Sequence, residues 1–446
     1  MVVIRTTLGK IQGVQHEQSD SFKGIPYALP PIGKRRFRHA ELWTQSWEGV
    51  RDARRFSAIP VQPPNTLESF FSTHHQTYEQ SEDCLTLNIW RPNQHSKDAP
   101  LPVLLYFYGG SFINGHSTQD LYQPKAIVEQ QPVIVVTCNY RLGALGFLDW
   151  SAINAAWNSN NGLSDQICAL RWVHQHINAF GGDPTRITLV GQSAGAMSIQ
   201  ALLQLPSVQP LVNNAVLMSG ILQPDTAEYA KQKAQTFQAL KTNIASETSW
   251  ETLSSETILQ LMAQHQAQYG KSKGLELLYQ PVNTETMPIQ ANAPLPCPIW
   301  MGVTSAEGDI YIKNEHKKLD TKQFQKVTTR AGLPKPATHD IQTAQQQRDY
   351  ITHHYFHRPF QAYLKTLKQH TDVYTYIFDW VHPTHTSYQS AYHILDILFW
   401  FGRLDIMTAQ GATVNAHDIQ LSQQMIQDLS TFAHTSQLPE KHHHYN

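Results

Sequence analysis

The segment that most constrains the fold of this chain is RITLVGQSAGAMSIQALL, residues 186–203. Its β-branched residues at 187–190 predict a strand, and residues 197–203 have helix-forming composition. The Gly-Gln-Ser-Ala-Gly sequence at 191–195 therefore lies in a tight turn between strand and helix. This is the Gly-x-Ser-x-Gly nucleophile elbow, in which small residues on either side of the serine let strand and helix approach. The pattern predicts Ser193 as a nucleophile and not only as the cap of the helix.

A nucleophilic serine needs partners, and these should lie elsewhere in the chain. Because an unaided hydroxyl is a poor nucleophile, a base must take its proton and a carboxylate must orient that base. In hydrolases with this elbow the chain order is serine, acid, histidine, so we expect both partners after Ser193. The oxyanion also needs backbone N–H donors. The Tyr-Gly-Gly-Ser-Phe turn at 108–112, which follows an apolar run at 103–107, is in a suitable place.

Continuous apolar runs of strand length indicate an α/β fold with a mainly parallel sheet, covered on both faces. The early runs lie at 103–108, 133–137 and 187–190, and similar runs return at 299–303 and 373–378. Strand, helix and strand alternate in the first half of the chain, which is the α/β signature.

A helix is predicted at 163–180, between the second and third of these runs. Its apolar residues recur at intervals of 3, 3 and 4, as on one face of a helix. We expect Ser164 or Asp165 to cap its start. The helical positions are Ile167, Leu170, Val173 and Ile177.

Charge and composition exclude several classes of protein. The 34 Lys and Arg against 35 Asp and Glu give a formal net charge of −1, so nucleic acid is not expected as the main partner. With 41% hydrophobic and 10% aromatic residues the 446-residue chain is globular. The apolar runs fall short of the roughly 18 residues of a membrane span, and the N-terminus shows no secretory signal. We therefore expect a cytoplasmic protein.

The four cysteines, Cys84, Cys138, Cys168 and Cys297, are scattered and form no C-x-x-C pair. We expect them to be buried free thiols rather than metal ligands.

Several longer segments resemble the type B carboxylesterases of the α/β-hydrolase superfamily, over about residues 7–433. The resemblance implies a twisted, mostly parallel central sheet with helices on both faces, helical insertions over the active site, no cofactor, no metal, and hydrolysis of carboxylic esters. The segments that carry it are FKGIPYALPPIGKRRF (22–37), SEDCLTLNIWRP (81–92), YGGSFINGHS (108–117), NYRLGALGFL (139–148), NGLSDQICALRWVHQHINAFGGDP (161–184) and GQSAGA (191–196).

The chain is predicted to form one domain, residues 1–446, with a helical insertion at about 225–296. From 225 to 270 the sequence is polar, rich in Gln, Ala and Thr, and has helical spacing without obvious strands. Two interpretations of this region stay open: a lid over the active site, or a surface helix pair with no role in access.

The family pattern also locates the other members of a catalytic triad. Its acid lies in a G-x-x-x-x-E-G segment after a late strand, which GVTSAEG matches with Glu307. Asp309 is the chemical competitor. The family histidine lies in an H-x-x-D segment, which SAYHILDILFWFG matches with His393. The alternatives for this histidine are His382 and His385.

By the same resemblance, the oxyanion donors are the N–H groups of Gly110, Ser111 and Ala194. The chain departs from the family at several points. Ser111 replaces a common third glycine, and Gln192 replaces the frequent glutamate before the nucleophile, which removes a negative charge. Cys84 matches a family cysteine that usually forms a disulfide, yet no cysteine precedes it.

The end of the chain, LPEKHHHYN, lacks the usual closing segment of the family. We expect its three histidines to be disordered and not to bind metal.

The predicted function is that of a serine carboxylic ester hydrolase, which cleaves small to medium neutral esters through an acyl-enzyme. Choline esters are expected to be poorer substrates, because residues 60–82 contain no Trp and Gln192 is uncharged. Phe70, Phe71 and Tyr78 still offer aromatic faces. The alternatives are an acyltransferase or amidase with the same triad, or a non-catalytic member of the family. The expected partner is a small-molecule ester; the oligomeric state is not predicted.

Overall fold

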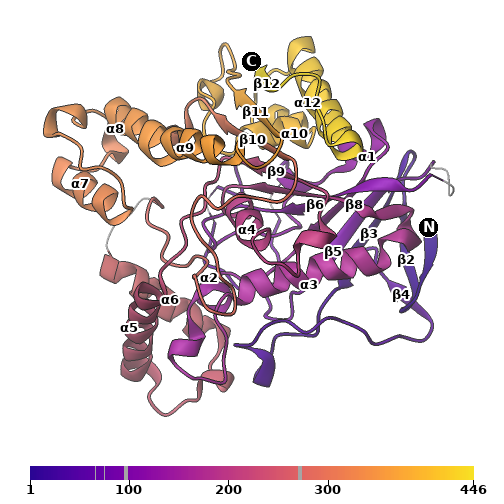
Figure 1. Cartoon of the computed structure of the whole chain (residues 1–446), viewed down its shortest axis with the longest axis horizontal. Coiled ribbons are helices and arrows are strands. Elements are labelled where there is room, and N and C mark those ends of the chain that lie inside the picture. Colours follow the sequence, from indigo (N-terminus) through magenta and orange to yellow (C-terminus); the bar gives the residue numbers. More distant parts are fainter. Residues whose placement is uncertain (66, 75, 95–98, 270–273) are drawn as a thin grey trace.

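The computed structural model describes the whole chain except residues 66, 75, 95–98 and 270–273 (Figure 1). Within the described residues the strands form one twelve-stranded sheet, in the order β1-β2-β3-β5-β7-β6-β8-β9-β10-β11-β12, with β4 paired to β2. The strands are β1 (Val2–Thr6), β2 (Gly9–Gln15), β3 (Ser19–Pro26), β4 (Val50–Asp52), β5 (Thr86–Pro92), β6 (Leu101–Phe107), β7 (Ile134–Cys138), β8 (Gly182–Gln192), β9 (Asn214–Met218), β10 (Ile299–Thr304), β11 (Val373–Phe378) and β12 (His442–Tyr445).

The sheet is mostly parallel, as predicted. Every neighbouring pair from β7 to β12 along the sheet order is parallel, and the strands expected from the apolar runs are β6, β7, β8, β10 and β11. The antiparallel part, β1-β2-β3-β5-β7, was not predicted. In β2 only alternate residues are buried, as expected for a strand with one solvated face. The sequence of β2 therefore has no continuous apolar run from which a strand could be predicted.

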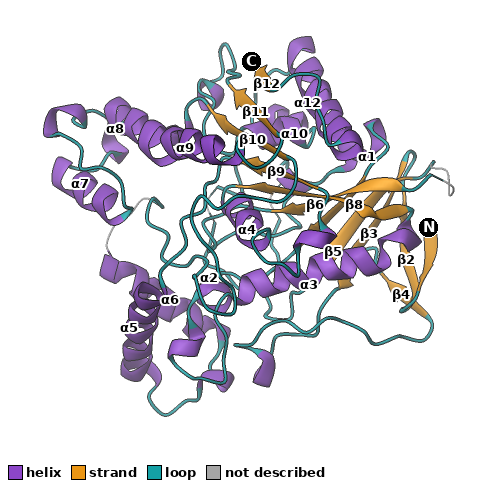
Figure 2. Cartoon of the chain, in the orientation of Figure 1, coloured by secondary structure: helices purple, strands orange, loops and turns teal. Residues whose placement is uncertain are grey.

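Helices cover both faces of the sheet, also as predicted (Figure 2). α1, α10 and α12 pack together on one face, whereas α3 and α4 contact β8 on the other. The helices are α1 (Lys125–Gln130), α2 (Gly143–Phe147), α3 (Asn161–His176), α4 (Ala194–Leu202), α5 (Ala227–Ala245), α6 (Ser255–Tyr269), α7 (Thr321–Arg330), α8 (Ala344–Ile351), α9 (Arg358–Leu367), α10 (Asp396–Trp400), α11 (Leu404–Ala409) and α12 (Ala416–Thr435).

The predicted cap of α3 is wrong. The helix begins at Asn161, and its N-cap, Asn160, has left-handed backbone angles and no side-chain cap. Asp165 instead receives the Arg141 guanidinium at 2.6 Å in a buried ion pair, and the Ser164 hydroxyl accepts from the Ala40 N–H. Asp165 and Ser164 therefore bind residues distant in sequence and do not cap the helix.

The C-terminal tail is an ordered strand, so the expectation of disorder is also wrong. β12 extends the sheet by pairing in parallel with β11, with His443 opposite Tyr376. The Tyr445 side chain is buried, and its hydroxyl donates to Asp428 of α12 at 2.6 Å. These contacts order residues 442–445, although their polar composition alone predicts a solvated tail.

The four cysteines are free and buried, as predicted. Burial raises the pKa of the thiols of Cys168 and Cys297 to about 12, so neither is a reactive thiolate near neutral pH.

Two hydrophobic cores are present among the described residues. The larger one lies on both sides of the sheet. The smaller one gathers residues from 275 to 356, around α7 and α8, and lies beside the region where Glu307 follows β10 (Figure 1). Its members are Leu275, Ile312, Leu319, Phe324, Val327, Ile341, Ala344, Tyr350, Ile351 and Phe356.

The predicted insertion at 225–296 contains the two helices α5 and α6 (Figure 1). These helices pack on each other, and α6 also contacts α2. Within the described part of the chain, helices that combine the length and apolarity needed to cross a membrane do not occur.

Candidate active site

The elbow is a place where the backbone leaves no room for side chains. Ser193 follows β8 with φ 55° and ψ −121°, a strained conformation for a residue other than glycine. A Cβ on Gly195 would overlap the carbonyl oxygen of Phe107, and a Cβ on Gly191 would lie 2.6 Å from the carbonyl carbon of Gly195. Both glycines of the motif are therefore required for strand β8 and helix α4 to meet as closely as they do.

Ser193 occupies the N-cap position of α4 but does not cap the helix with its side chain. Its N–H donates to the Met218 carbonyl at 2.7 Å, which fixes the turn against β9. Ser193 is half-buried. The capping role, which competed with the nucleophile in the sequence, is absent here.

Glu307 and His393 meet in the structure although 86 residues separate them in the chain. The Nδ1 of His393 lies 2.6 Å from Oε2 of Glu307. The other oxygen, Oε1, accepts the Thr304 N–H at 2.9 Å, which holds the carboxylate at the end of β10. Glu307 is 0% exposed and His393 is 7% exposed. A buried carboxylate on Nδ1 leaves the Nε2 of the ring free to act as a base.

The competing residues lie elsewhere. Asp309 forms an ion pair with Arg348 at 3.4 Å and does not contact His393. The Nε2 atoms of His382 and His385 lie 3.0 and 3.1 Å from the carbonyl oxygens of residues 413 and 410, so these two rings are bound to backbone.

At its other edge His393 meets Gln192 and not Ser193. The Nε2 of His393 lies 3.2 Å from Nε2 of the Gln192 amide. Among the described residues no hydrogen bond joins the Ser193 hydroxyl to His393. In enzymes without bound substrate such catalytic bonds are often long, so this geometry does not argue against the pair. The Phe356 ring packs on His393 with centroids 5.0 Å apart, and Tyr311 lies at 6.1 Å.

The loop after β6 presents backbone amides beside the nucleophile. Gly110, Ser111 and Phe112 all have positive φ, of 117°, 56° and 60°. A Cβ on the preceding Gly109 would lie 2.9 Å from the Ser193 Cβ, so this loop and the elbow are in close contact.

The three amides predicted as oxyanion donors come from the loop after β6 and from the start of α4. The N–H groups of Gly110, Ser111 and Ala194 have no acceptor among the described residues. Gly110 is exposed and Ser111 is half-buried. Free N–H donors at the start of a helix and in an adjacent turn can bind a developing oxyanion.

A second buried carboxylate, which the sequence analysis did not single out, lies close to the first. Asp396 is 0% exposed, and its Oδ2 accepts the Tyr376 hydroxyl at 2.9 Å. Burial, and then the charge of Glu307, raise the pKa of Asp396 to about 6. The signal was available in the H-x-x-D spacing, which places an acidic residue three positions after His393, at the start of α10.

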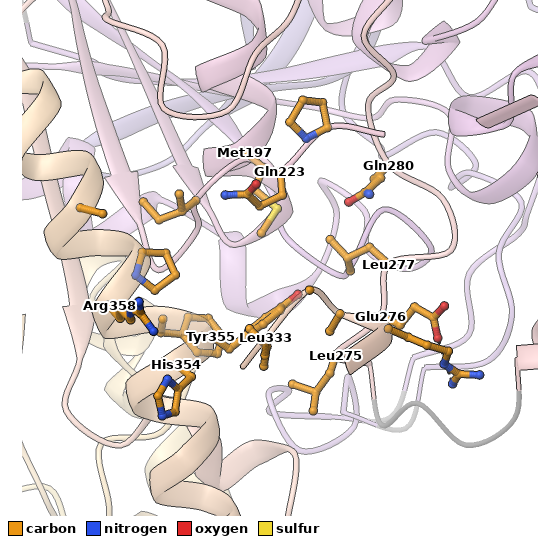
Figure 3. A pocket seen from close by; sticks show the side chains of 18 of the residues that line it. Met197, Gln223, Leu275, Glu276, Leu277, Gln280, Leu333, His354, Tyr355 and Arg358 are labelled. Carbon is orange, nitrogen blue, oxygen red and sulfur yellow. Dashed lines mark ion pairs between the residues drawn. The ribbon is translucent and has the colours of Figure 1, made fainter. Parts of the chain in front are cut away.

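A cavity of about 740 Å³, here called the Met197 cavity, begins beside the elbow. The Met197 N–H donates to the Ser193 carbonyl at 3.0 Å, so this wall lies one helical turn from the nucleophile. Phe356, which packs on His393, also lines it. Figure 3 shows Met197 at one side of the cavity, with Leu275 and Tyr355 at the other.

A second cavity, here called the Phe70 cavity, has a volume of about 960 Å³. Ala306 and Tyr392 line it, and these residues directly precede Glu307 and His393. Neighbours of Glu307 and His393 therefore line two spaces, each in the size range of small-molecule sites.

No cluster of three or more His, Cys, Asp or Glu side chains that could hold a metal ion is found among the described residues.

Comparison with known proteins identifies the family of this chain. The family model described as the carboxylesterase family matches residues 1–445. The chain belongs to the carboxylesterase family. It is 34% identical over 448 residues to the para-nitrobenzyl esterase of Bacillus subtilis, which covers 97% of this chain and 90% of that protein. It is 40% identical over 230 residues to the acetylcholinesterase of Danio rerio, covering 49% of this chain and 36% of that protein.

Solved structures of the family extend the match to the fold. A thermophilic PNB esterase superposes with a TM-score of 0.88 at 32% identity, covering 97% of this chain and 91% of that chain. The chain is a carboxylesterase with the α/β-hydrolase fold, and it hydrolyses carboxylic esters through the acyl-enzyme mechanism that is general in its family.

Proposed function

We propose that Ser193, His393 and Glu307 are the triad of this esterase, and that Gly110, Ser111 and Ala194 supply the oxyanion donors. The observation that carries the proposal is the 2.6 Å contact of His393 with a buried Glu307, beside an elbow whose glycines cannot be replaced.

In this mechanism the Ser193 oxygen bonds to the ester carbonyl carbon while its proton moves to Nε2 of His393. The carbonyl oxygen becomes an anion held by the three amides. His393 then gives the proton to the leaving alcohol as the carbon–oxygen bond breaks, and water repeats the sequence on the acyl-enzyme. Glu307 keeps the Nδ1 proton in place and stabilises the positive ring.

We propose further that the two arms of the ester occupy the Met197 and Phe70 cavities, and that both arms are uncharged. In the Phe70 cavity the carboxylates of Asp309 and Asp349 are matched by Lys313 and Arg348, so the formal charge is zero with histidines neutral.

The Met197 cavity has one carboxylate, Glu276, against Arg330 and Arg358. Neither cavity therefore has an excess of negative charge to attract a cation. The para-nitrobenzyl group in the name of the Bacillus subtilis relative is uncharged as well, which supports a neutral alcohol arm.

The test compares kcat/KM for butyrylcholine with that for a neutral butyrate ester of equal leaving-group reactivity. We expect the neutral ester to be preferred, because neither cavity has an excess of negative charge and a cation over an aromatic face, such as that of Phe70 or Tyr392, gains only about 0.5–2 kcal/mol. A tenfold preference for the choline ester, about 1.4 kcal/mol, would contradict the neutral-substrate proposal.

A cytoplasmic location and a single domain with an inserted helical region at 225–296 remain part of this proposal. Four free, buried cysteines are compatible with a reducing compartment. The lid interpretation of the inserted region predicts that its deletion changes KM for bulky esters more than for acetate esters.

A further inference from the structure

The contact between Gln192 and His393 has chemical consequences of its own. Gln192 is the last residue of β8, is 1% exposed, and directly precedes the nucleophile. Its Nε2 lies 3.2 Å from Nε2 of His393, the same nitrogen that must accept the Ser193 proton.

The protonation of the ring decides which group donates in this contact. With its Nδ1 proton donated to Glu307, the neutral ring of His393 has a lone pair on Nε2. An amide NH₂ can donate to that lone pair, whereas a carboxylate cannot. Once Nε2 is protonated it becomes a donor, and only an acceptor can then face it favourably.

We propose that Gln192 is a positioning residue for the catalytic base: its NH₂ donates to the lone pair of neutral His393 in the resting enzyme and so favours the neutral ring. The inference rests on the proposed triad. It assigns to Gln192 the function of favouring the neutral base, which a carboxylate at this position would oppose.

The surroundings of Gln192 support a fixed amide. A Cβ on Gly109 would overlap Oε1 of Gln192, so the glycine of the oxyanion loop packs directly on this side chain. In the sheet, the backbone of Gln192 pairs with Met218 of β9. The amide therefore lies at the junction of the elbow, the oxyanion loop and the base.

The other groups around His393 do not duplicate this function. Glu307 contacts the opposite nitrogen, and Asp396 acts on the ring only by charge. Phe356 packs on the ring and has no ionisable group, and Tyr311 lies with its ring centroid 6.1 Å away. Among these neighbours, Gln192 is the one that forms a hydrogen bond at Nε2.

The experiment measures the rate of inactivation by a fluorophosphonate as a function of pH, in the wild-type enzyme and in Gln192→Glu and Gln192→Met. Both replacements are close to glutamine in size. Inactivation needs the neutral base, so the rate falls on the acid side with a midpoint that reports the base. Thermal unfolding of each variant shows whether it is folded.

In Gln192→Glu the midpoint should move to higher pH by about 1 unit or more, because an opposite charge within a few ångströms favours the protonated ring. In Gln192→Met it should move up by about half a unit, because one hydrogen bond to the neutral ring is lost. The expected order of midpoints is Gln, then Met, then Glu.

Gln200→Met is the matched control. Gln200 lies on α4, is equally buried, and donates to the Gly220 carbonyl at 2.7 Å without contacting His393. This variant should lose stability but keep the wild-type midpoint. A purely structural function of Gln192 would give the same pattern in Gln192→Met.

The inference is overturned if the three midpoints coincide, or if Gln192→Met lies below the wild type. Mass spectrometry of the labelled peptides separates this failure from failure of the triad. Label on Ser193 with coincident midpoints refutes only the function of Gln192, whereas label on another residue refutes the proposed triad itself.

Discussion

The elbow region and the region of the smaller hydrophobic core, residues 275–356, border the same catalytic histidine but are built on different principles. At the elbow, backbone atoms of β6, β8 and α4 touch, so that Gly191 and Gly195 allow no Cβ. In the smaller core, side chains such as Leu319 and Phe324 fill space between short helices. The first region is fixed by conformations that only certain residues adopt, whereas the second tolerates many combinations of apolar residues of suitable total volume.

This difference explains why the elbow could be predicted from the sequence and the smaller core could not. A requirement for glycine at two fixed positions around a serine leaves a pattern that a single sequence displays. A requirement for apolar volume produces only an apolar composition, and many other helices have the same composition. We therefore expect mutations to have different effects in the two regions. Substitutions at the elbow should mainly lower the catalytic rate, and substitutions in the smaller core should mainly lower the free energy of unfolding.

The largest effect is expected from the triad. Ser193→Ala and His393→Ala should each lower kcat by about 10⁴ to 10⁶, and the double variant should be little worse, because triad residues act as one unit. Ser193→Ala should unfold at about the wild-type temperature, since Ser193 is only half-buried and its side chain makes no cap. His393→Ala should unfold at a lower temperature, because it leaves the buried Glu307 carboxylate without its partner. Steady-state kinetics with a p-nitrophenyl ester measures the loss. Additive losses in the double variant would show that the two residues do not act together.

Gly195→Ala should have the next largest effect. The new Cβ meets the Phe107 carbonyl, so the elbow must shift, and displacement of the nucleophile by about 1 Å can cost about 10² in rate. The control is Gly411→Ala, where nothing lies within 4 Å of the new Cβ although φ is +88°. If Gly195→Ala retains wild-type kcat/KM, the close contact at the elbow is not required for activity.

A matched pair of leucines compares the two cores directly. Leu189 lies in β8 below the elbow, and Leu319 lies in the smaller core; both are buried. Each change to alanine should cost about 2–5 kcal/mol of packing. Leu189→Ala should also lower kcat/KM, because β8 carries Ser193, whereas Leu319→Ala should lower it less. The pair is measured by chemical denaturation and by kinetics at a temperature where both variants are folded.

The smallest effect concerns pH and Asp396. Its pKa rises from the ordinary 3.8 to about 6 in the folded protein, so the folded state binds this proton more tightly than the unfolded state. Stability contributed by the protonated form is therefore present below about pH 4 and is lost as the pH rises through about 6. Asp396→Asn should be more stable than the wild type at pH 8, by up to about 3 kcal/mol, and equal to it near pH 4. The measurement is the free energy of unfolding of both proteins at pH 4 and pH 8. An Asp396→Asn variant that is less stable than the wild type at pH 8 would contradict this prediction.

The parallel half of the sheet and the contact of Glu307 with His393 were predictable because their signals are local or depend on motifs. Apolar runs gave β6, β7, β8, β10 and β11, and segment patterns gave Glu307 and His393, which the structure brings together.

Other features depend on partners distant in sequence. β12 exists because β11 offers a free edge and Asp428 receives the Tyr445 hydroxyl. Asp165 binds Arg141 and so does not cap α3. The hydrogen bond of Gln192 to His393 also could not be predicted, since it joins residues 201 positions apart.

The central claim is that Ser193 is the nucleophile activated by His393 and Glu307. The most direct measurement is covalent labelling of the full-length protein with a fluorophosphonate, followed by mass spectrometry of the peptides. The proposed triad predicts one label on Ser193, none in Ser193→Ala, and strongly slowed labelling in His393→Ala and Glu307→Gln. Label that persists in Ser193→Ala, or full-speed labelling of Ser193 in His393→Ala, would contradict the claim.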